Sequence, residues 1–257
     1  MTACLIYHDV VAIAERDRVG FPGRLAGRYK HTPEQFGEHL SAIAQTGRPV
    51  GLWPADGCAA DRVVLTFDDG GASALAIADG LEAHGWRGHF FITTQRIGEQ
   101  GFLGADGVRE LAARGHDVGS HSHTHPPYIG RLPPSAAERE WTESREILTG
   151  VLGDAPDTAA VPGGQLGPSL LGAVRAAGYT TLMTSEPIVR HRRVDGLQVV
   201  GRFTIWDSTP PQTAAAYARE ERAARARLWA QWRLKRLANN LSPRAYDALR
   251  RVRAGGR

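Results

Sequence analysis

The stretch Thr66-Phe67-Asp68-Asp69-Gly70-Gly71 follows the apolar run Val63-Val64-Leu65 and precedes a helical pattern from Ser73 to Ala83. It predicts a buried strand that carries two acids to the C-terminal edge of a sheet, where α/β proteins build their active sites. Adjacent carboxylates repel each other, a cost that is tolerated where one of them binds a cation or holds a proton. The hexapeptide alone leaves a second interpretation open, an Asp-Gly turn with both acids in solvent.

Further short apolar runs along the chain alternate with helical patterns. The predicted strands cover residues 5–7, 62–67, 88–92, 116–120, 158–161, 179–183 and 198–206. The predicted helices between them include one that opens at Thr32-Pro33, where Thr32 serves as the cap and Pro33 occupies the first turn. Six to eight strands that alternate with helices favour a parallel, barrel-like α/β sheet with right-handed crossovers. At 257 residues the chain fits a single domain of this class.

Composition narrows the class of protein. No run approaches the roughly 18 apolar residues that span a membrane, and the N-terminus shows neither a basic leader nor a long apolar segment. We therefore expect a cytoplasmic protein. The two cysteines, Cys4 and Cys58, lie far apart without metal-type spacing, which argues against a disulfide framework or a cysteine metal site.

Charge is distributed unevenly along the chain. Residues 217–257 contain 12 of the 31 Lys and Arg residues but only 3 of the 27 Asp and Glu residues. The pattern predicts a basic helical extension over 211–257, with a helix from Tyr217 to Leu241 and a short final helix after Ser242-Pro243, beyond a catalytic domain at 1–210. Its apolar stripe either packs on the barrel or, with the arginines, places the protein at the periphery of an anionic membrane surface or on a lipid-linked glycan. No nucleic-acid partner is expected.

Histidines cluster after the strand at 116–120. His121 and His125 share one side if the chain makes a helical turn, whereas His121, His123 and His125 face one way if the chain stays extended. In both cases neutral nitrogen ligands lie near the acids Asp68 and Asp69 on a neighbouring strand end. Two His and one Asp with one open position form a catalytic metal arrangement rather than a closed structural one.

The motifs Thr66-Phe67-Asp68-Asp69-Gly70 and Gly119-Ser120-His121-Ser122-His123-Thr124-His125-Pro126 resemble the first two motifs of the polysaccharide deacetylase family, also called the NodB-homology domain or carbohydrate esterase family 4. The resemblance covers about residues 3–206 and implies the distorted (β/α) barrel of that family. It also implies that Asp69, His121 and His125 hold a divalent metal, usually Zn²⁺. Asp68 would then be the general base.

The resemblance extends to a third motif with one departure. The motif Arg-x-Pro-Tyr-Gly corresponds to Ala160-Val161-Pro162-Gly163-Gly164, so the backbone N–H of Gly163 is the candidate oxyanion donor. The arginine that orients the base in relatives is Ala160 here. Arg202, on the predicted strand at 198–206, is the candidate substitute.

A second departure concerns the general acid, because the family's C-terminal Leu-x-x-His has no counterpart near residue 200. Tyr7-His8-Asp9 instead resembles the circularly permuted branch of exopolysaccharide deacetylases with an N-terminal Tyr-His motif. By that likeness His8 protonates the leaving amine and Asp9 supports it. A buried structural role for the His8 imidazole is the alternative.

The resemblance implies a metal-dependent hydrolase that removes acetyl groups, N-acetyl in preference to O-acetyl, from a sugar of a polysaccharide or glycan precursor. Two alternatives remain open at this stage. One is hydrolysis of another non-peptide C–N bond, as in cyclic-amide hydrolases that resemble this family, against which the intact Asp-His-His set argues. The other is a catalytically degenerate glycan-binding or scaffold protein, suggested by the missing arginine and the missing C-terminal histidine.

Overall fold

The computed structural model describes residues 1–54, 61–164, 166–167 and 169–241. Its strands are β1 Ala3–Tyr7, β2 Val63–Phe67, β3 His89–Ile92, β4 Asp117–Ser120, β5 Thr158–Ala160, β6 Thr181–Met183, β7 Arg192–Val194, β8 Leu197–Val200 and β9 Phe203–Thr204. Its α-helices are α1 Arg24–Gly27, α2 Pro33–Ala44, α3 Ala74–Glu82, α4 Ala105–Ala113, α5 Pro134–Leu152, α6 Leu170–Ala176, α7 Pro211–Ala218 and α8 Arg222–Leu241.

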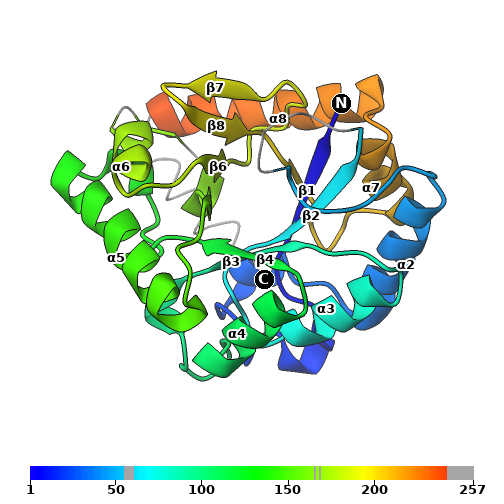
Figure 1. The fold of residues 1–257 in the computed structure, drawn as a ribbon. Helices are drawn as coiled ribbons and strands as arrows, with labels where there is room; N and C mark the ends of the chain where they lie inside the picture. Colours follow the sequence, from blue (N-terminus) through cyan, green and yellow to red (C-terminus); the bar gives the residue numbers. More distant parts are fainter. Residues whose placement is uncertain (55–60, 165, 168, 242–257) are drawn as a thin grey trace.

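The strands form one nine-stranded sheet in the order β7-β8-β6-β5-β4-β3-β2-β1-β9. The short β7 is antiparallel to β8, and the other strand pairs of the described residues are parallel. Figure 1 shows the sheet curled inside a ring of helices, with α2 to α6 on its outside. This arrangement confirms the predicted distorted (β/α) barrel.

The predicted strand at 198–206 is divided in the structure. β8 pairs with β6, whereas β9 pairs with β1, close to the opposite end of the sheet order. Between them the chain crosses the open side of the barrel over Gly201 and Arg202. A Cβ at Gly201 would lie 2.5 Å from the carbonyl oxygen of Glu186, so only glycine fits where the chain crosses. The crossing leaves Arg202 fully buried, at 1% exposure.

Alternation along the strands sorts side chains between the two faces of the sheet. In β2, Leu65 and Phe67 belong to the core between sheet and helices, whereas Val64 belongs to a smaller cluster with residues such as Cys4 and Phe91. Because successive side chains of a strand point to opposite faces, Thr66 and then Asp68 share the face of Val64.

Helix α2 forms as its sequence predicts. The Thr32 hydroxyl accepts a hydrogen bond from the Gln35 N–H, and the Gln35 side chain accepts one from the Thr32 N–H. This reciprocal cap satisfies two N–H groups at the start of the helix. One face of the helix is buried through Phe36, Leu40 and Ile43.

The predicted helix from Tyr217 to Leu241 is two helices in the structure. Tyr217 lies in α7, which packs on α2 and β1 and places Ala214, Tyr217 and Ala218 in the hydrophobic core between the sheet and the helices. The chain turns at Glu220, whose φ is 58°, and α8 begins at Arg222. Sequence periodicity missed this break because contacts distant in sequence impose it. The short helix predicted after Ser242 lies outside the described residues.

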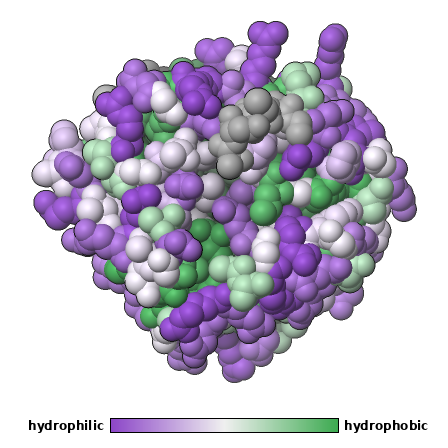
Figure 2. Space-filling model, in the orientation of Figure 1, coloured by the Kyte–Doolittle hydropathy of each residue, from purple (hydrophilic) through white to green (hydrophobic). Residues whose placement is uncertain are grey.

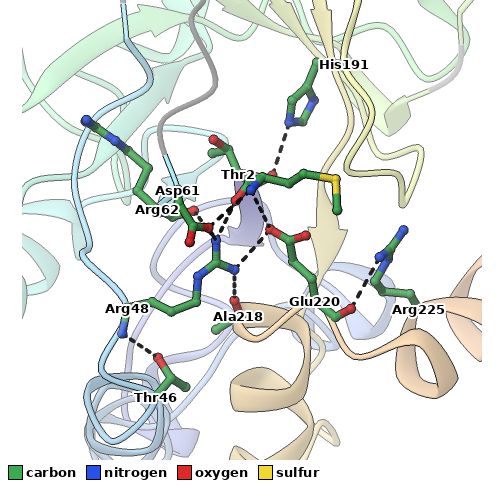
Figure 3. Close-up of polar contacts among 10 residues, drawn as sticks. Thr2, Thr46, Arg48, Asp61, Arg62, His191, Ala218, Glu220 and Arg225 are labelled. Carbon is green, nitrogen blue, oxygen red and sulfur yellow. Dashed lines mark hydrogen bonds and ion pairs between the residues drawn. The ribbon is translucent and has the colours of Figure 1, made fainter.

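A polar cluster holds this turn (Figure 3). The Arg48 guanidinium donates to the Glu220 carboxylate at 3.1 Å and also to the carbonyl of Ala218 and the carboxylate of Asp61. It further donates to the Met1 carbonyl at 2.5 Å. Arg225 of α8 donates to the Glu220 carbonyl at 3.3 Å. The first turn of α8 is therefore fixed beside the N-terminal end of β1.

Hydrophilic side chains cover most of the molecular face in Figure 2, with hydrophobic residues in small groups among them. Within the described residues, no helix is both long and apolar enough to cross a membrane. Exposed large hydrophobic residues nonetheless occur on α8, where Leu234 is 68% and Leu237 is 51% exposed.

Buried neutral histidines predict how stability depends on pH. Burial lowers the pKa of His31 to about 4, and its Nε2 donates to the Trp206 carbonyl at 3.0 Å. The unfolded chain, with an ordinary histidine pKa near 6.5, binds more protons between pH 6.5 and 4, so stability is present above this window and is lost as pH falls through it. Between pH 7 and pH 5 we expect His31 to account for a loss of about 2 kcal/mol.

A His31→Gln variant lacks this titration while keeping an N–H donor for Trp206. Its free energy of unfolding, measured by urea denaturation, should fall less than that of the parent between pH 7 and pH 5. Each protein is compared with itself at pH 8, which removes any constant effect of the substitution. Parallel curves for the two proteins would contradict the assignment.

Candidate active site

Asp68 and Arg202 form a buried ion pair at the C-terminal ends of the strands. The Arg202 guanidinium donates to both carboxylate oxygens of Asp68, at 2.7 and 2.9 Å, and also to the Thr66 hydroxyl at 2.9 Å. The Arg202 Nε donates to the Thr184 carbonyl at 3.2 Å. The guanidinium carbon lies 5.4 Å from the centroid of the Phe91 ring. A two-pronged contact of this kind fixes the carboxylate in position as well as in charge.

The pair determines the protonation state of Asp68. Burial is the largest single influence and raises the pKa of its carboxyl, but the charge and hydrogen bonds of Arg202, together with smaller influences of neighbouring groups, outweigh burial and lower the pKa to about 2. Asp68 is therefore ionised throughout the neutral range. Arg202 therefore makes the contact with Asp68 that is expected of a substitute for the arginine missing at position 160.

Asp69, His121 and His125 lie together beside this pair. Their potential ligand atoms all lie within 4.8 Å of one another. Oδ1 of Asp69 is 3.5 Å from Nε2 of His121 and 3.5 Å from Nε2 of His125. The histidines meet through a tight turn, in which His123 points elsewhere, with its Nδ1 3.0 Å from the Thr94 hydroxyl. The extended alternative for the three histidines is therefore wrong.

Several features of these three residues suit a cation. Burial lowers the pKa of His121 to about 3, so its imidazole is neutral, and its Nδ1–H donates to the Ala160 carbonyl at 2.9 Å, which leaves the Nε2 lone pair free to bind. Burial raises the pKa of Asp69 to about 7, and its Oδ1 is buried without a hydrogen-bond partner. A divalent cation would satisfy that oxygen and favour the ionised carboxylate. The residues therefore fit a metal.

His8 and Asp68 line one small cavity, together with Asp9. The His8 ring packs on Tyr29 at 4.6 Å between centroids, and its Nδ1 is buried without a partner. Asp9 is 2% exposed, and one of its oxygens accepts a hydrogen bond from the Ser73 hydroxyl at 2.8 Å. Asp9 and His8 therefore line the same cavity, but among the described contacts no hydrogen bond joins their side chains.

Gly163 lies on the surface just after β5, with φ at 65° and open space where a Cβ would be. β5 also provides the Ala160 carbonyl that orients His121. Gly163 thus follows the strand that contacts His121, at the edge of the sheet where the candidate metal cluster of Asp69, His121 and His125 lies.

The segment at residues 11–31 lies beside the candidate metal cluster, and the sequence did not predict this position. Phe21 packs on the ring of His125 at 4.7 Å between centroids. The buried ammonium of Lys30 holds this loop, because it donates to the carbonyls of Phe21, at 2.7 Å, Val19 and Arg16. Phe21 and His125 lie far apart in the chain, so local sequence patterns do not reveal their contact.

Comparisons with known proteins agree with this site. Residues 57–182, which include both motifs, match the sequence model of the polysaccharide deacetylase family. The segment 57–182 therefore belongs to the polysaccharide deacetylase family. YxkH of Bacillus subtilis (strain 168), a protein assigned as a polysaccharide deacetylase, is 26% identical over 135 residues, which are 52% of this chain and 47% of YxkH.

Two further relatives show how much of the chain the similarity covers. The peptidoglycan-N-acetylglucosamine deacetylase of Bacillus cereus is 29% identical over 107 residues, 41% of this chain and 37% of that enzyme. This chain therefore spans less than half the length of these two curated relatives. The crystal structure of BC0361, a polysaccharide deacetylase from Bacillus cereus, matches 84% of this chain and 68% of its own with a TM-score of 0.70 at 18% identity. That likeness shows the shared fold.

The cluster predicts a loss of metal binding in three variants. Asp69→Ala, His121→Ala and His125→Ala each remove one of three candidate ligands, so each should weaken Zn²⁺ binding by more than the roughly 10 to 100-fold typical of changes to outer-shell partners. Zn²⁺ affinity is measured by competition with a chromophoric chelator. His123→Ala is the matched control, since this residue lies between two ligands but contacts Thr94, and it should bind Zn²⁺ as the parent does.

Proposed function

We propose that this protein is a metal-dependent hydrolase that removes acetyl groups, most readily N-acetyl groups, from a sugar of a polysaccharide or glycan precursor. The observation that carries the proposal is the cluster of Asp69, His121 and His125 beside the ion pair of Asp68 and Arg202. Membership of the polysaccharide deacetylase family supports it.

Zn²⁺ is the metal we propose, because mixed imidazole and carboxylate ligands with one open position are typical of catalytic zinc sites. Bound there, the cation would lower the pKa of a water molecule and polarise an acetyl carbonyl. Asp69, His121 and His125 would hold it. The His125 side chain is 25% exposed, and this exposure leaves one side of the cluster accessible to substrate.

Asp68 acts as the general base in this proposal. Its ionised carboxylate can accept a proton from the attacking water, and the two hydrogen bonds from Arg202 keep it aligned. A pKa of about 2 makes Asp68 a weak base. Its contribution is therefore largest for a water whose pKa has already been lowered, and it includes orientation of that water.

His8 is proposed to protonate the leaving amine from the other side of the site. It lines the same cavity as Asp68 and carries a buried nitrogen without a partner. Asp9, which accepts a hydrogen bond from the Ser73 hydroxyl and lines the same cavity, is the proposed support for His8. The backbone N–H of Gly163 is the proposed donor to the oxyanion.

The two competing functions fit less well. A hydrolase of another C–N bond would need no complete Asp-His-His set. A scaffold protein would need no aligned base, and the ion pair at Asp68 removes the argument based on the missing arginine at position 160. Acetate release from N-acetylated oligosaccharides, compared with O-acetylated ones and with cyclic amides, separates the three functions.

Asp68→Asn should keep Zn²⁺ but release acetate two to four orders of magnitude more slowly, because it removes a positioned base. Acetate is measured enzymatically after incubation with chitooligosaccharides, and Zn²⁺ content by elemental analysis of the same samples. Asp106→Asn, at an exposed position on α4, is the control for loss of a carboxylate. Zn²⁺ bound by the parent without acetate release from any saccharide would favour the scaffold function.

A second proposal concerns the partner of α8, which we expect to be an anionic membrane surface. Trp229, Leu234 and Leu237 are 40%, 68% and 51% exposed, so the predicted apolar stripe does not pack on the barrel at these positions. Arg233 lies over the Trp229 ring, 4.8 Å from its centroid. Helices with exposed tryptophan and leucine among arginines lie in membrane interfaces, where each basic residue contributes about 1 kcal/mol.

Sedimentation with vesicles tests the membrane proposal. The full chain should bind vesicles that contain phosphatidylserine, should bind neutral vesicles less, and should be released by salt, because exposed charges are screened beyond about 8 Å at physiological ionic strength. Replacement of Trp229, Leu234 and Leu237 together by Ser should abolish binding. Ile147→Ser, at another exposed apolar position, is the control. Equal binding to both vesicle types would contradict the proposal.

A further inference from the structure

The loop that joins the two histidine ligands adopts an unfavourable backbone conformation. Ser122 has φ of 63° and His125 has φ of 57°, values that residues other than glycine rarely adopt. Backbone strain of this kind persists only where the surrounding structure imposes it. Contacts from outside the loop must therefore hold it in the form that brings His125 to His121.

Glu140 of α5 makes such contacts. One of its carboxylate oxygens accepts hydrogen bonds from the N–H groups of His123, at 3.0 Å, and Thr124, at 2.8 Å. The other oxygen accepts from the Thr124 hydroxyl at 2.6 Å. Hydrogen bonds to an ionised acceptor are roughly twice as strong as those between neutral groups. A single side chain therefore binds the centre of the loop at three points.

Helix α5 provides a firm base for this carboxylate. The next residue, Trp141, is fully buried, and Leu148 is buried two turns later. The same helix supports the start of the loop, because the Ser144 hydroxyl lies 2.6 Å from the Ser120 hydroxyl, which in turn accepts from the Ser122 N–H at 3.0 Å. A side chain on a rigid helix can hold a ligand more accurately than one on another loop.

We propose that Glu140 is a positioning residue for the metal site, which holds the backbone between His121 and His125 in the ligand-binding conformation. The inference rests on the proposed metal site but assigns a role to a residue that contacts neither ligand side chain. Without Glu140, the loop can relax from its strained conformation, and His125 then moves away from His121 and Asp69.

An alternative is that the negative charge of Glu140 attracts the cation from a distance. Glu140→Gln separates the two explanations. Its side-chain oxygen can accept from the two N–H groups while its NH₂ donates to the Thr124 hydroxyl, so all three contacts survive and the charge is lost. Glu140→Ala removes both the contacts and the charge.

Glu143 offers a matched control on the same helix. Its carboxylate lies 3.7 Å from Nε2 of His123, so it faces the same loop with the same charge but contacts a ring instead of the loop backbone. Glu143→Ala therefore removes a nearby negative charge and leaves the three backbone contacts intact.

The experiment measures Zn²⁺ affinity of the metal-stripped full chain by chelator competition, and the Co²⁺ absorption spectrum as a report on ligand geometry. Glu140→Ala should lose roughly 10 to 100-fold in Zn²⁺ affinity and change the Co²⁺ spectrum, while Glu140→Gln and Glu143→Ala stay within about 3-fold of the parent. Thr124→Val removes only one of the three contacts and should give a smaller loss, which keeps the test usable if Glu140→Ala does not fold.

Two outcomes overturn the inference. The first is unchanged Zn²⁺ affinity in Glu140→Ala, whether or not its metal-stripped form unfolds at a lower temperature. The second is an equal loss of affinity in Glu140→Gln and Glu140→Ala. A parent protein that binds no Zn²⁺ would instead overturn the proposed metal site itself, so the two failures can be told apart.

Discussion

The buried ion pair of Arg202 and Asp68 is the interaction on which both the barrel and the site depend. Arg202 lies where the chain crosses from β8 to β9, and its guanidinium reaches the end of β2 inside the barrel. Loss of one partner from such a pair leaves an uncompensated buried charge, which typically costs about 3 to 5 kcal/mol. Arg202, which lies where the chain crosses between the two ends of the sheet, also orients the proposed base Asp68. Fold and site are therefore coupled through one contact.

The contact with Arg202 also makes the pKa values of two adjacent carboxyl groups, those of Asp68 and Asp69, differ. Asp68 meets a guanidinium and has a pKa of about 2, whereas Asp69 faces neutral imidazoles and has a pKa of about 7. The backbone also differs between the two residues. Asp69 has φ of 82°, so the chain no longer follows the strand conformation there. One acid is thereby suited to accept a proton and the other to bind a cation.

Strained backbone is concentrated at this end of the barrel. Among the described residues, five residues other than glycine have positive φ, and three of them, Asp69, Ser122 and His125, belong to the candidate metal cluster or to the loop that joins its histidines. α8 starts at the opposite end, where Arg48 joins Glu220 to the Met1 carbonyl. The first turns of α8 therefore lie away from the candidate metal cluster.

The sequence by itself determined most strands and most helices, because apolar periodicity, caps and glycine turns act within a few residues of one another. It also determined the membership of the family and the short list of acids and histidines, since their spacing along the chain suffices to recognise them. Local signals did not reveal the break at Glu220, the division of the strand around Gly201 or the turn that excludes His123. Tertiary structure alone decided these features, along with the pairing of Arg202 with Asp68 and the contacts of Glu140 with the histidine loop. Each depends on groups that lie far apart in the chain and meet only when the barrel closes.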